Sequence, residues 1–314
     1  MCFFLFLEYK TIISAFAVEI RHIFLYNEKK RIIQDEIIIF RTEDVPMRFG
    51  YCTGFAAGMT GPIDYKTLDM IQAAGYDYVE FPLMQLADLP QDEFDALKAY
   101  LSGMTIGCDA CCNMFPARVR LLGEEASDTV IDEYLSVAFA RMAELGTKTI
   151  VLGSSGARRL PEGMSKEEGV KALAEVIARH VIPRLEKHDV TLVMEPIGSY
   201  EANFINTLPD GMEVVNAVNH PRVQLLADSV HLLYENESPE HITRYAKNLR
   251  HIHLCEDERA LPAEGISQGL KAILEAIRES GYDLCASFEP MPHSVDQMRA
   301  ALEQVKRALG RETA

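Results

Sequence analysis

The chain has 314 residues, of which 31 are Lys or Arg and 47 are Asp or Glu, which gives a formal net charge of −16 at pH 7. Its 48% hydrophobic and 25% charged residues are ordinary for a globular protein and exclude a disordered chain. The acidic balance argues against a nucleic-acid partner, because phosphate binding needs a net basic surface.

The first 46 residues differ in composition from the rest of the chain. They hold nine Ile and six Phe but no Gly, whereas all 19 Gly lie beyond residue 46. A folded α/β domain needs Gly at turns and helix ends. We therefore expect residues 1–46 to lie outside the folded domain, either upstream of a true start at Met47 or as a disordered extension. The alternative is an extension that packs on the domain or on a partner.

The same N-terminal stretch carries no recognisable targeting signal. Glu8 and Lys10 interrupt the apolar run that starts at Met1, and no small-residue cleavage site follows. The longest uncharged run here, residues 11–18, falls far short of the ~18–20 residues of a membrane span. The seven Cys are an odd number, which without a secretion signal indicates reduced thiols. We predict a cytoplasmic protein without membrane association.

From residue 48 onward, short β-branched and apolar runs alternate with longer segments whose apolar residues recur three and four apart. The short runs predict eight strands: Arg48–Thr53, Tyr78–Pro82, Thr105–Asn113, Thr149–Ser154, Thr191–Pro196, Val223–Ser229, Leu249–Cys255 and Leu284–Pro290. The clearest predicted helices are Ile131–Leu145, Lys166–Lys187, Leu270–Ser280 and Ser294–Leu309.

Eight β/α units predict a single-domain α/β fold over residues 47–314, a (β/α)8 TIM barrel. The competing architecture is a doubly wound sheet. Such a sheet usually opens on a Gly-rich phosphate-binding turn, and the segment from Gly50 to Gly54 does not have that pattern.

Four consecutive predicted strands carry chemically useful residues near their ends. These are Glu195, Asp228, His253 and Glu289, at separations of 33, 25 and 36 residues. Function in a TIM barrel gathers at the carboxyl ends of the strands. Each residue alone has an ordinary structural explanation, but four in phase on adjacent strands predict a metal site, because unpaired buried charges are costly.

Two Glu, one Asp and one His suit one divalent cation: Mn²⁺, Co²⁺, Mg²⁺ or Zn²⁺. Residue types alone do not select among these ions, and we favour Mn²⁺ or Co²⁺.

Several motifs in the same region resemble one family. They are Glu195-Pro-Ile-Gly-Ser-Tyr-Glu201, Asn203-Phe-Ile-Asn206-Thr207, Asp228-Ser-Val-His231, His251-Ile-His253 with Arg259 six residues further on, and Phe288-Glu289-Pro290. The chain resembles the xylose-isomerase-like barrel superfamily of sugar (phosphate) isomerases and epimerases. Within it, the chain is most similar to ketose 3-epimerases of the D-tagatose/D-psicose (allulose) type, over Met47–Leu309.

This resemblance implies roles for particular residues. Glu195, Asp228, His253 and Glu289 would bind the metal, and Glu201, His231 and Arg259 would contact substrate oxygens. Glu195 and Glu289 can also flank a sugar carbon and serve as catalytic base and acid, which suits proton removal beside a ketone and return on the other face. The resemblance further implies a small-molecule sugar substrate and a homo-oligomer, a dimer or a tetramer.

The function we predict is therefore metal-dependent isomerisation or epimerisation of a ketose or ketose phosphate through an enediolate, with C3 epimerisation favoured. Dehydration of an inosose and isomerisation of hydroxypyruvate are alternatives on the same metal scaffold. DNA repair would need more His ligands and a basic groove, and a non-catalytic sugar-binding barrel would not need the carboxylate pair.

Weaker signals leave alternatives open. Gly153-Ser154-Ser155-Gly156, with Arg158 and Arg159 after it, could cradle a phosphate or form a tight turn at the barrel mouth. Glu80 could support a substrate hydroxyl, act behind the metal or form a structural ion pair. His251 is expected lower in the barrel, behind the metal or in packing. Cys108, Cys111 and Cys112 are expected to be buried thiols, because no second zinc-type Cys pair exists.

Overall fold

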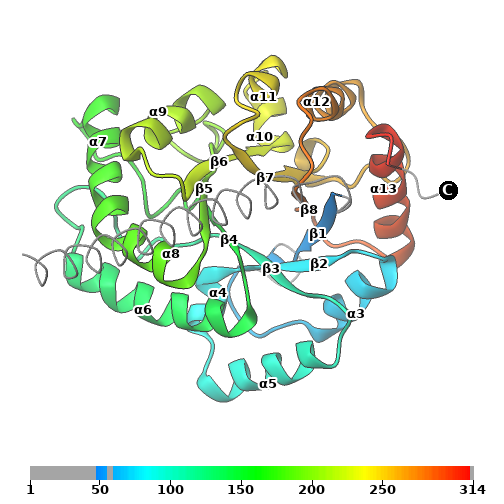
Figure 1. The fold of residues 1–314 in the computed structure, drawn as a ribbon, viewed down its shortest axis with the longest axis horizontal. Coiled ribbons are helices and arrows are strands. Elements are labelled where there is room, and N and C mark those ends of the chain that lie inside the picture. Colours follow the sequence, from blue (N-terminus) through cyan, green and yellow to red (C-terminus); the bar gives the residue numbers. More distant parts are fainter. Residues whose placement is uncertain (1–46, 55–58, 312–314) are drawn as a thin grey trace, which may run out of the picture. The chain divides into compact units, whose positions relative to one another are not determined.

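The computed structural model describes residues 47–54 and 59–311. Eight parallel strands form a closed barrel in chain order, and the last strand pairs with the first (Figure 1). The strands are β1 (Arg48–Cys52), β2 (Tyr78–Pro82), β3 (Gly107–Cys112), β4 (Thr149–Leu152), β5 (Thr191–Met194), β6 (Val223–Asp228), β7 (Leu249–Leu254) and β8 (Cys285–Phe288). The predicted TIM barrel is confirmed and the doubly wound sheet is wrong. The expectations for residues 1–46 lie outside the described residues.

Helical segments connect the strands around the outside of the barrel, as Figure 1 shows. They are α3 (Tyr65–Ala74), α4 (Leu83–Asp88), α5 (Gln91–Ser102), α6 (Asp128–Leu145), α7 (Lys166–Val176), η1 (Ile177–Val181), α8 (Ile182–His188), α9 (Leu208–Val218), α10 (Ser229–Tyr234), α11 (Glu240–Arg244), η2 (Asp257–Arg259), α12 (Gln268–Glu279) and α13 (Val295–Ala308). None of these helices has the length and apolarity that crossing a membrane requires.

Local sequence explains where the helices begin. Ser165 caps α7 and Ser294 caps α13, each in a reciprocal capping box with the residue three positions on. Such a cap satisfies two of the backbone N–H groups that a helix leaves unpaired at its start. The predicted start at Ser294 is therefore a cap, and α13 begins one residue later.

The predicted helix over Lys166–Lys187 is not regular. Its middle turn, η1, is a π-helical segment between α7 and α8. Pro183 stands near the start of α8, and a proline both lacks an N–H and crowds the carbonyl four residues earlier. The wider π turn relieves this conflict and keeps Leu173, Ile177 and Val181 buried against the core.

A small apolar cluster fills the barrel interior below its mouth. It consists of Cys52, Cys112, Val151, Val193 and Leu226. Val193 and Leu226 each stand two residues before a predicted ligand, so their side chains lie on the same inward face of their strands. These apolar side chains therefore form part of the layer beneath the predicted metal site, while the larger core lies between the strands and the outer helices.

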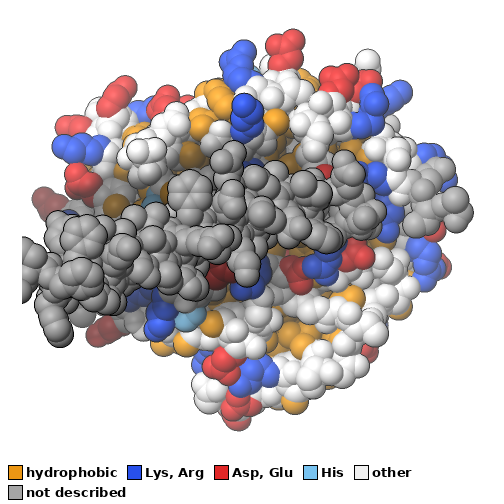
Figure 2. Space-filling model, in the orientation of Figure 1, with side chains coloured by type: hydrophobic (Ala, Val, Ile, Leu, Met, Phe, Trp, Pro, Cys, Tyr) orange, Lys and Arg blue, Asp and Glu red, His pale blue; other side chains and the backbone are white. Residues whose placement is uncertain are grey.

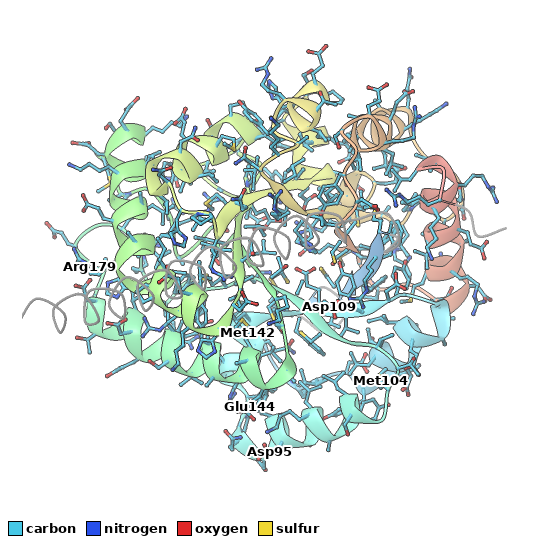
Figure 3. The ribbon with its side chains drawn as sticks, viewed as in Figure 1. Asp95, Met104, Asp109, Met142, Glu144 and Arg179 are labelled. Carbon is cyan, nitrogen blue, oxygen red and sulfur yellow. The ribbon has the colours of Figure 1, made fainter. Side chains whose placement is uncertain are left out.

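The outer helices are joined by exposed ion pairs. Lys98 on α5 contacts Asp95 at 2.9 Å and also Glu144 on α6, and Figure 3 labels both acids. Arg179 in η1 contacts Asp128 at 2.9 Å. Exposed pairs of this kind are worth ~0–1 kcal/mol each, so burial in the core dominates stability. Figure 2 shows acidic and basic side chains intermixed on the visible face, without a field of one sign.

Candidate metal centre

Four buried side chains from four consecutive strands meet at the carboxyl end of the barrel. Glu195 follows β5, Asp228 ends β6, His253 stands one residue before the end of β7, and Glu289 follows β8. One ligand atom of each lies within 4.8 Å of the others. Their side chains are nearly inaccessible, at 7% exposure or less. The structure thus brings all four sequence-predicted ligands together.

Strand register explains this convergence. Asp228 on β6 pairs directly with His253 on β7. The ladder also continues one residue beyond β5 and β8, because the backbone N–H of Glu195 donates to Leu152 (3.2 Å) and that of Glu289 donates to Leu254 (3.3 Å). These bonds hold both glutamates at the level of the strand ends, with their side chains over the mouth.

His253 turns its two ring nitrogens in opposite directions. Nδ1 lies 3.0 Å from Oε1 of Glu195, 3.5 Å from Oε2 of Glu289 and 3.8 Å from Oδ2 of Asp228. Nε2 lies 3.2 Å from Oε1 of Glu80, on the other side of the ring. Nδ1 is therefore the nitrogen that faces the carboxylates.

Asp228 provides the test of whether these residues fit a cation. Its Oδ1 accepts a hydrogen bond from the backbone N–H of Val230 at 2.7 Å. Its Oδ2 is buried and has no hydrogen-bond partner among the described residues. A buried carboxylate oxygen without a partner is costly. A divalent cation between the three carboxylates and Nδ1 of His253 would satisfy it, so the donor set fits one such ion.

The two flanking glutamates differ electrostatically. Burial raises the pKa of Glu195, although its contact with His253 works against that shift. Burial acts in the same direction on Glu289, but the Arg259 guanidinium and His253 outweigh it and lower the pKa of Glu289. The two carboxyl groups therefore stand in different electrostatic environments.

Arg259 and His231, two of the predicted substrate residues, also reach this cluster. Nη1 of Arg259 donates to Oε2 of Glu289 at 2.5 Å and lies 3.9 Å from Oδ2 of Asp228. Nε2 of His231 lies 3.7 Å from the same Oδ2. Glu258 and Arg259 both have positive φ, +53° and +57°, which costs a non-glycine residue of order 1–3 kcal/mol. This strained turn directs Arg259 back over the mouth.

Glu201, the third predicted substrate residue, is not part of the cluster. It is exposed on the loop after β5, where the Ser155 hydroxyl donates to its Oε1 at 3.4 Å. Its neighbour Tyr200 lies nearer the site, with its hydroxyl 3.4 Å from Nδ1 of His231 and its ring in tilted contact with that of Tyr234, at an interplanar angle of 57°. No sequence signal had singled out Tyr200, since an aromatic residue in a loop is common.

Residues 153–156 after β4 could form either a phosphate cradle or a tight turn, and the structure favours the turn. Arg158 is fully buried, and its guanidinium donates to the backbone carbonyls of Gly153 (2.6 Å), Glu195 (3.2 Å), Ile205 (3.4 Å) and Phe204. A side chain at Gly153 would overlap the Glu195 carboxylate. The small residues therefore form a tight turn that admits Glu195 and Arg158, and the Arg158 part of the phosphate hypothesis is wrong.

Below the cluster lies a buried carboxylate that the sequence only hinted at. Glu80 on β2 has no solvent exposure and is hydrogen-bonded to both His251 and His253. Burial would raise the pKa of Glu80, but the two imidazoles outweigh it and hold that pKa well below its usual range. The structure excludes a substrate-hydroxyl contact by this residue, and it places His251 lower in the barrel as expected.

The cysteines of the described region are all free thiols. Cys108, Cys111 and Cys112 are buried, as expected, and burial raises the pKa of Cys111 well above its usual value. Cys52, Cys112 and Glu80 lie close enough together to hold a metal. However, both oxygens of Glu80 are already occupied by hydrogen bonds, so this trio is a packed layer beneath the main site.

Comparison with known families agrees with this geometry. The family model described as a xylose isomerase-like TIM barrel matches residues 68–309, well over half of the chain. The chain belongs to this family. The four ligand-type side chains of this xylose isomerase-like barrel stand at or next to the ends of four strands, where the sequence motifs predicted them.

Several named relatives of this xylose isomerase-like barrel are epimerases. One is instead an inosose dehydratase of Clostridium beijerinckii, 30% identical over 98 residues, 30% of this chain and 33% of that protein. A D-psicose 3-epimerase of Enterocloster bolteae is 29% identical over 125 residues, 40% of this chain and 41% of that protein. A ketose 3-epimerase of Arthrobacter globiformis is 25% identical over 223 residues, 71% of this chain and 75% of that protein. A solved L-ribulose 3-epimerase matches with a TM-score of 0.71 and 20% identity, over 84% of this chain and 95% of that one. The last likeness concerns the fold alone.

Proposed function

We propose that the protein is a divalent-metal-dependent sugar epimerase that acts at C3 of a ketose through an enediolate. The observation that carries this proposal is the pair of buried carboxylates, Glu195 after β5 and Glu289 after β8, in a site whose remaining ligand-type residues are Asp228 and His253. Two of the named relatives, those of Enterocloster bolteae and Arthrobacter globiformis, are ketose 3-epimerases, isomerase-class enzymes, which supports the same reaction.

In this proposal, the two glutamates move the proton. One removes the proton from the carbon beside the ketone, and the other returns a proton to the opposite face. When bound, the cation supplies Lewis-acid polarisation of the ketone oxygen. We keep Mn²⁺ or Co²⁺ as the favoured ions, with Mg²⁺ or Zn²⁺ compatible with the same donors.

Residues at the rim would hold the substrate. Arg259 and His231 stand beside the carboxylates, where they can bind the substrate oxygens and spread the developing negative charge. Glu201 would bind from the loop after β5, next to Tyr200. Because the Arg158 guanidinium is committed to backbone carbonyls, we favour a free ketose over a ketose phosphate. We also propose a cytoplasmic homo-oligomer, a dimer or a tetramer.

A substrate panel tests the proposal. Full-length protein loaded with Mn²⁺ is incubated with D-psicose, D-tagatose, L-ribulose, a ketose phosphate, hydroxypyruvate and an inosose, and products are separated by chromatography. We expect conversion of at least one free ketose into its C3 epimer, and loss of that activity after treatment with a chelator. Loss of water from the inosose with every ketose unchanged would contradict the epimerase assignment and favour a dehydratase.

A further inference from the structure

A chain of buried hydrogen bonds runs beneath the candidate metal site. The hydroxyls of Tyr78 and Ser287 lie 2.9 Å apart, and Ser287 donates to Oε2 of Glu80 at 2.5 Å. The same Oε2 lies 2.8 Å from Nε2 of His251, and Oε1 lies 3.2 Å from Nε2 of His253. All five side chains are buried to more than nine-tenths, so no exchange with solvent weakens these bonds.

The direction of each bond in this chain follows from the chemistry of its members. Ser287 can donate its one proton to Glu80 while it accepts from Tyr78. A carboxylate only accepts, and three donors converge on the two oxygens of Glu80. Both histidines must then carry a proton on Nε2. For His253 this leaves Nδ1, the nitrogen that faces Glu195, Asp228 and Glu289, as the one that can offer a lone pair to a cation once its own proton has left.

We propose that Glu80 is the positioning residue of the metal site: it holds the His253 ring with Nε2–H pointing down and Nδ1 directed at the cation. The same carboxylate fixes His251, so one buried charge orients two imidazoles. This inference rests on the metal-dependent function proposed above. Carboxylate-to-histidine contacts of this kind set the tautomer of a ligand and raise its basicity in metalloproteins generally.

The Glu80→Gln variant tests whether Glu80 orients the two imidazoles or only fills space beneath the site. The glutamine has nearly the same shape, but its amide has one accepting oxygen and one donating nitrogen. It can therefore accept from only one imidazole and must donate to the other. If it donates to His253, Nδ1 acquires the proton and can no longer bind metal. If it donates to His251, that ring is left with an Nδ1–H, and Nδ1 of His251 is buried without a partner among the described side chains.

The test is the affinity for Mn²⁺ alone, measured by calorimetry on the metal-free full-length protein. We expect Glu80→Gln to bind Mn²⁺ about 10–100-fold more weakly than the wild type. Glu237→Gln is the matched control: Glu237 is another shielded carboxylate, with 4% side-chain exposure, that accepts from a histidine, His241, at 2.7 Å. It should leave the affinity unchanged.

The outcomes distinguish this inference from the proposed function. A wild type that binds no divalent cation overturns both. A wild type that binds one Mn²⁺, with equal affinity in Glu80→Gln, overturns the role of Glu80 and leaves the epimerase proposal standing. A second bound ion that disappears in Glu80→Gln also overturns it, because Glu80 would then be a ligand itself.

Should Glu80→Gln fail to fold, the wild type provides the decisive readout. In Zn²⁺-loaded protein, ¹H–¹⁵N correlation spectra of the imidazoles report which nitrogen carries the proton. We expect an Nε2–H on His253 with Nδ1 bound to the metal, and Ser287→Ala should keep that tautomer because the carboxylate remains. Binding through Nε2 of His253 would contradict the proposal.

Discussion

Replacing either of the two catalytic carboxylates, as Glu195→Gln or Glu289→Gln, should strongly slow epimerisation while leaving proton exchange on one face of the sugar carbon. Each glutamate serves one face of the sugar carbon, so a variant that keeps one carboxylate can still remove and return the proton of one epimer. We expect turnover to fall by about 10²–10⁴-fold, the usual contribution of a positioned general acid or base. If the variant still exchanges the C3 proton with solvent, it has lost one catalytic carboxylate and not the whole site.

The measurement is deuterium incorporation at C3 in D₂O, started from each epimer separately and at saturating Mn²⁺. Glu195→Gln should label one epimer without converting it, and Glu289→Gln should label the other. Glu201→Gln at the rim is the control, because it changes a proposed substrate contact and removes no proton-transfer group. If both glutamine variants epimerise at the wild-type rate, neither carboxylate is the base or the acid.

Arg158→Met should destabilise the fold by about 3–5 kcal/mol, the cost typical of removing one partner from a buried charged network. Arg158 is fully buried and donates to four backbone carbonyls from the loops after β4 and β5. Burial lowers its pKa from 12.5 only to about 10, so it stays charged at neutral pH. Methionine keeps the packing of the stem but leaves those carbonyls buried without a donor.

Urea unfolding followed by circular dichroism measures this change in the free energy of unfolding. Arg159→Met is the matched control, because Arg159 is the exposed neighbour and surface substitutions usually stay within ~0.5 kcal/mol. Ile205 has a positive φ of +62°, which is unfavourable for a β-branched residue, and Arg158 holds its backbone carbonyl. We therefore expect the backbone at Ile205 to become more mobile in Arg158→Met. Equal stability of the two variants would contradict the assigned role of Arg158.

The contrast between Arg158 and Arg159 shows what sequence can and cannot predict here. The strands and their order could be predicted because apolar periodicity and β/α spacing are local properties of the chain. The four ligand-type residues followed, because adjacent parallel strands bring their carboxyl ends to one edge. Nothing local distinguishes two consecutive arginines, of which one is buried and the other exposed.

Loop residues and contacts between distant parts of the chain account for the other differences between the site expected from sequence and the site in the structure. Glu201 could be matched to a motif, but its exposed position depends on the path of the loop after β5. The sequence left three roles open for Glu80. It could not choose among them, because the partners of Glu80, His251, His253 and Ser287, lie 171 to 207 residues further along the chain. Contacts of such separation arise only when the barrel closes.

The central claim is that Glu195, Asp228, His253 and Glu289 hold one divalent cation on which proton transfer at a ketose carbon depends. The most direct measurement is deuterium incorporation at C3 of D-psicose in D₂O, compared between wild type loaded with one equivalent of Mn²⁺ and the Asp228→Asn variant treated in the same way. The account predicts a C3 epimer carrying deuterium from the wild type and none from the variant. Equal incorporation by both proteins, or turnover by the wild type that survives complete removal of metal, would contradict it.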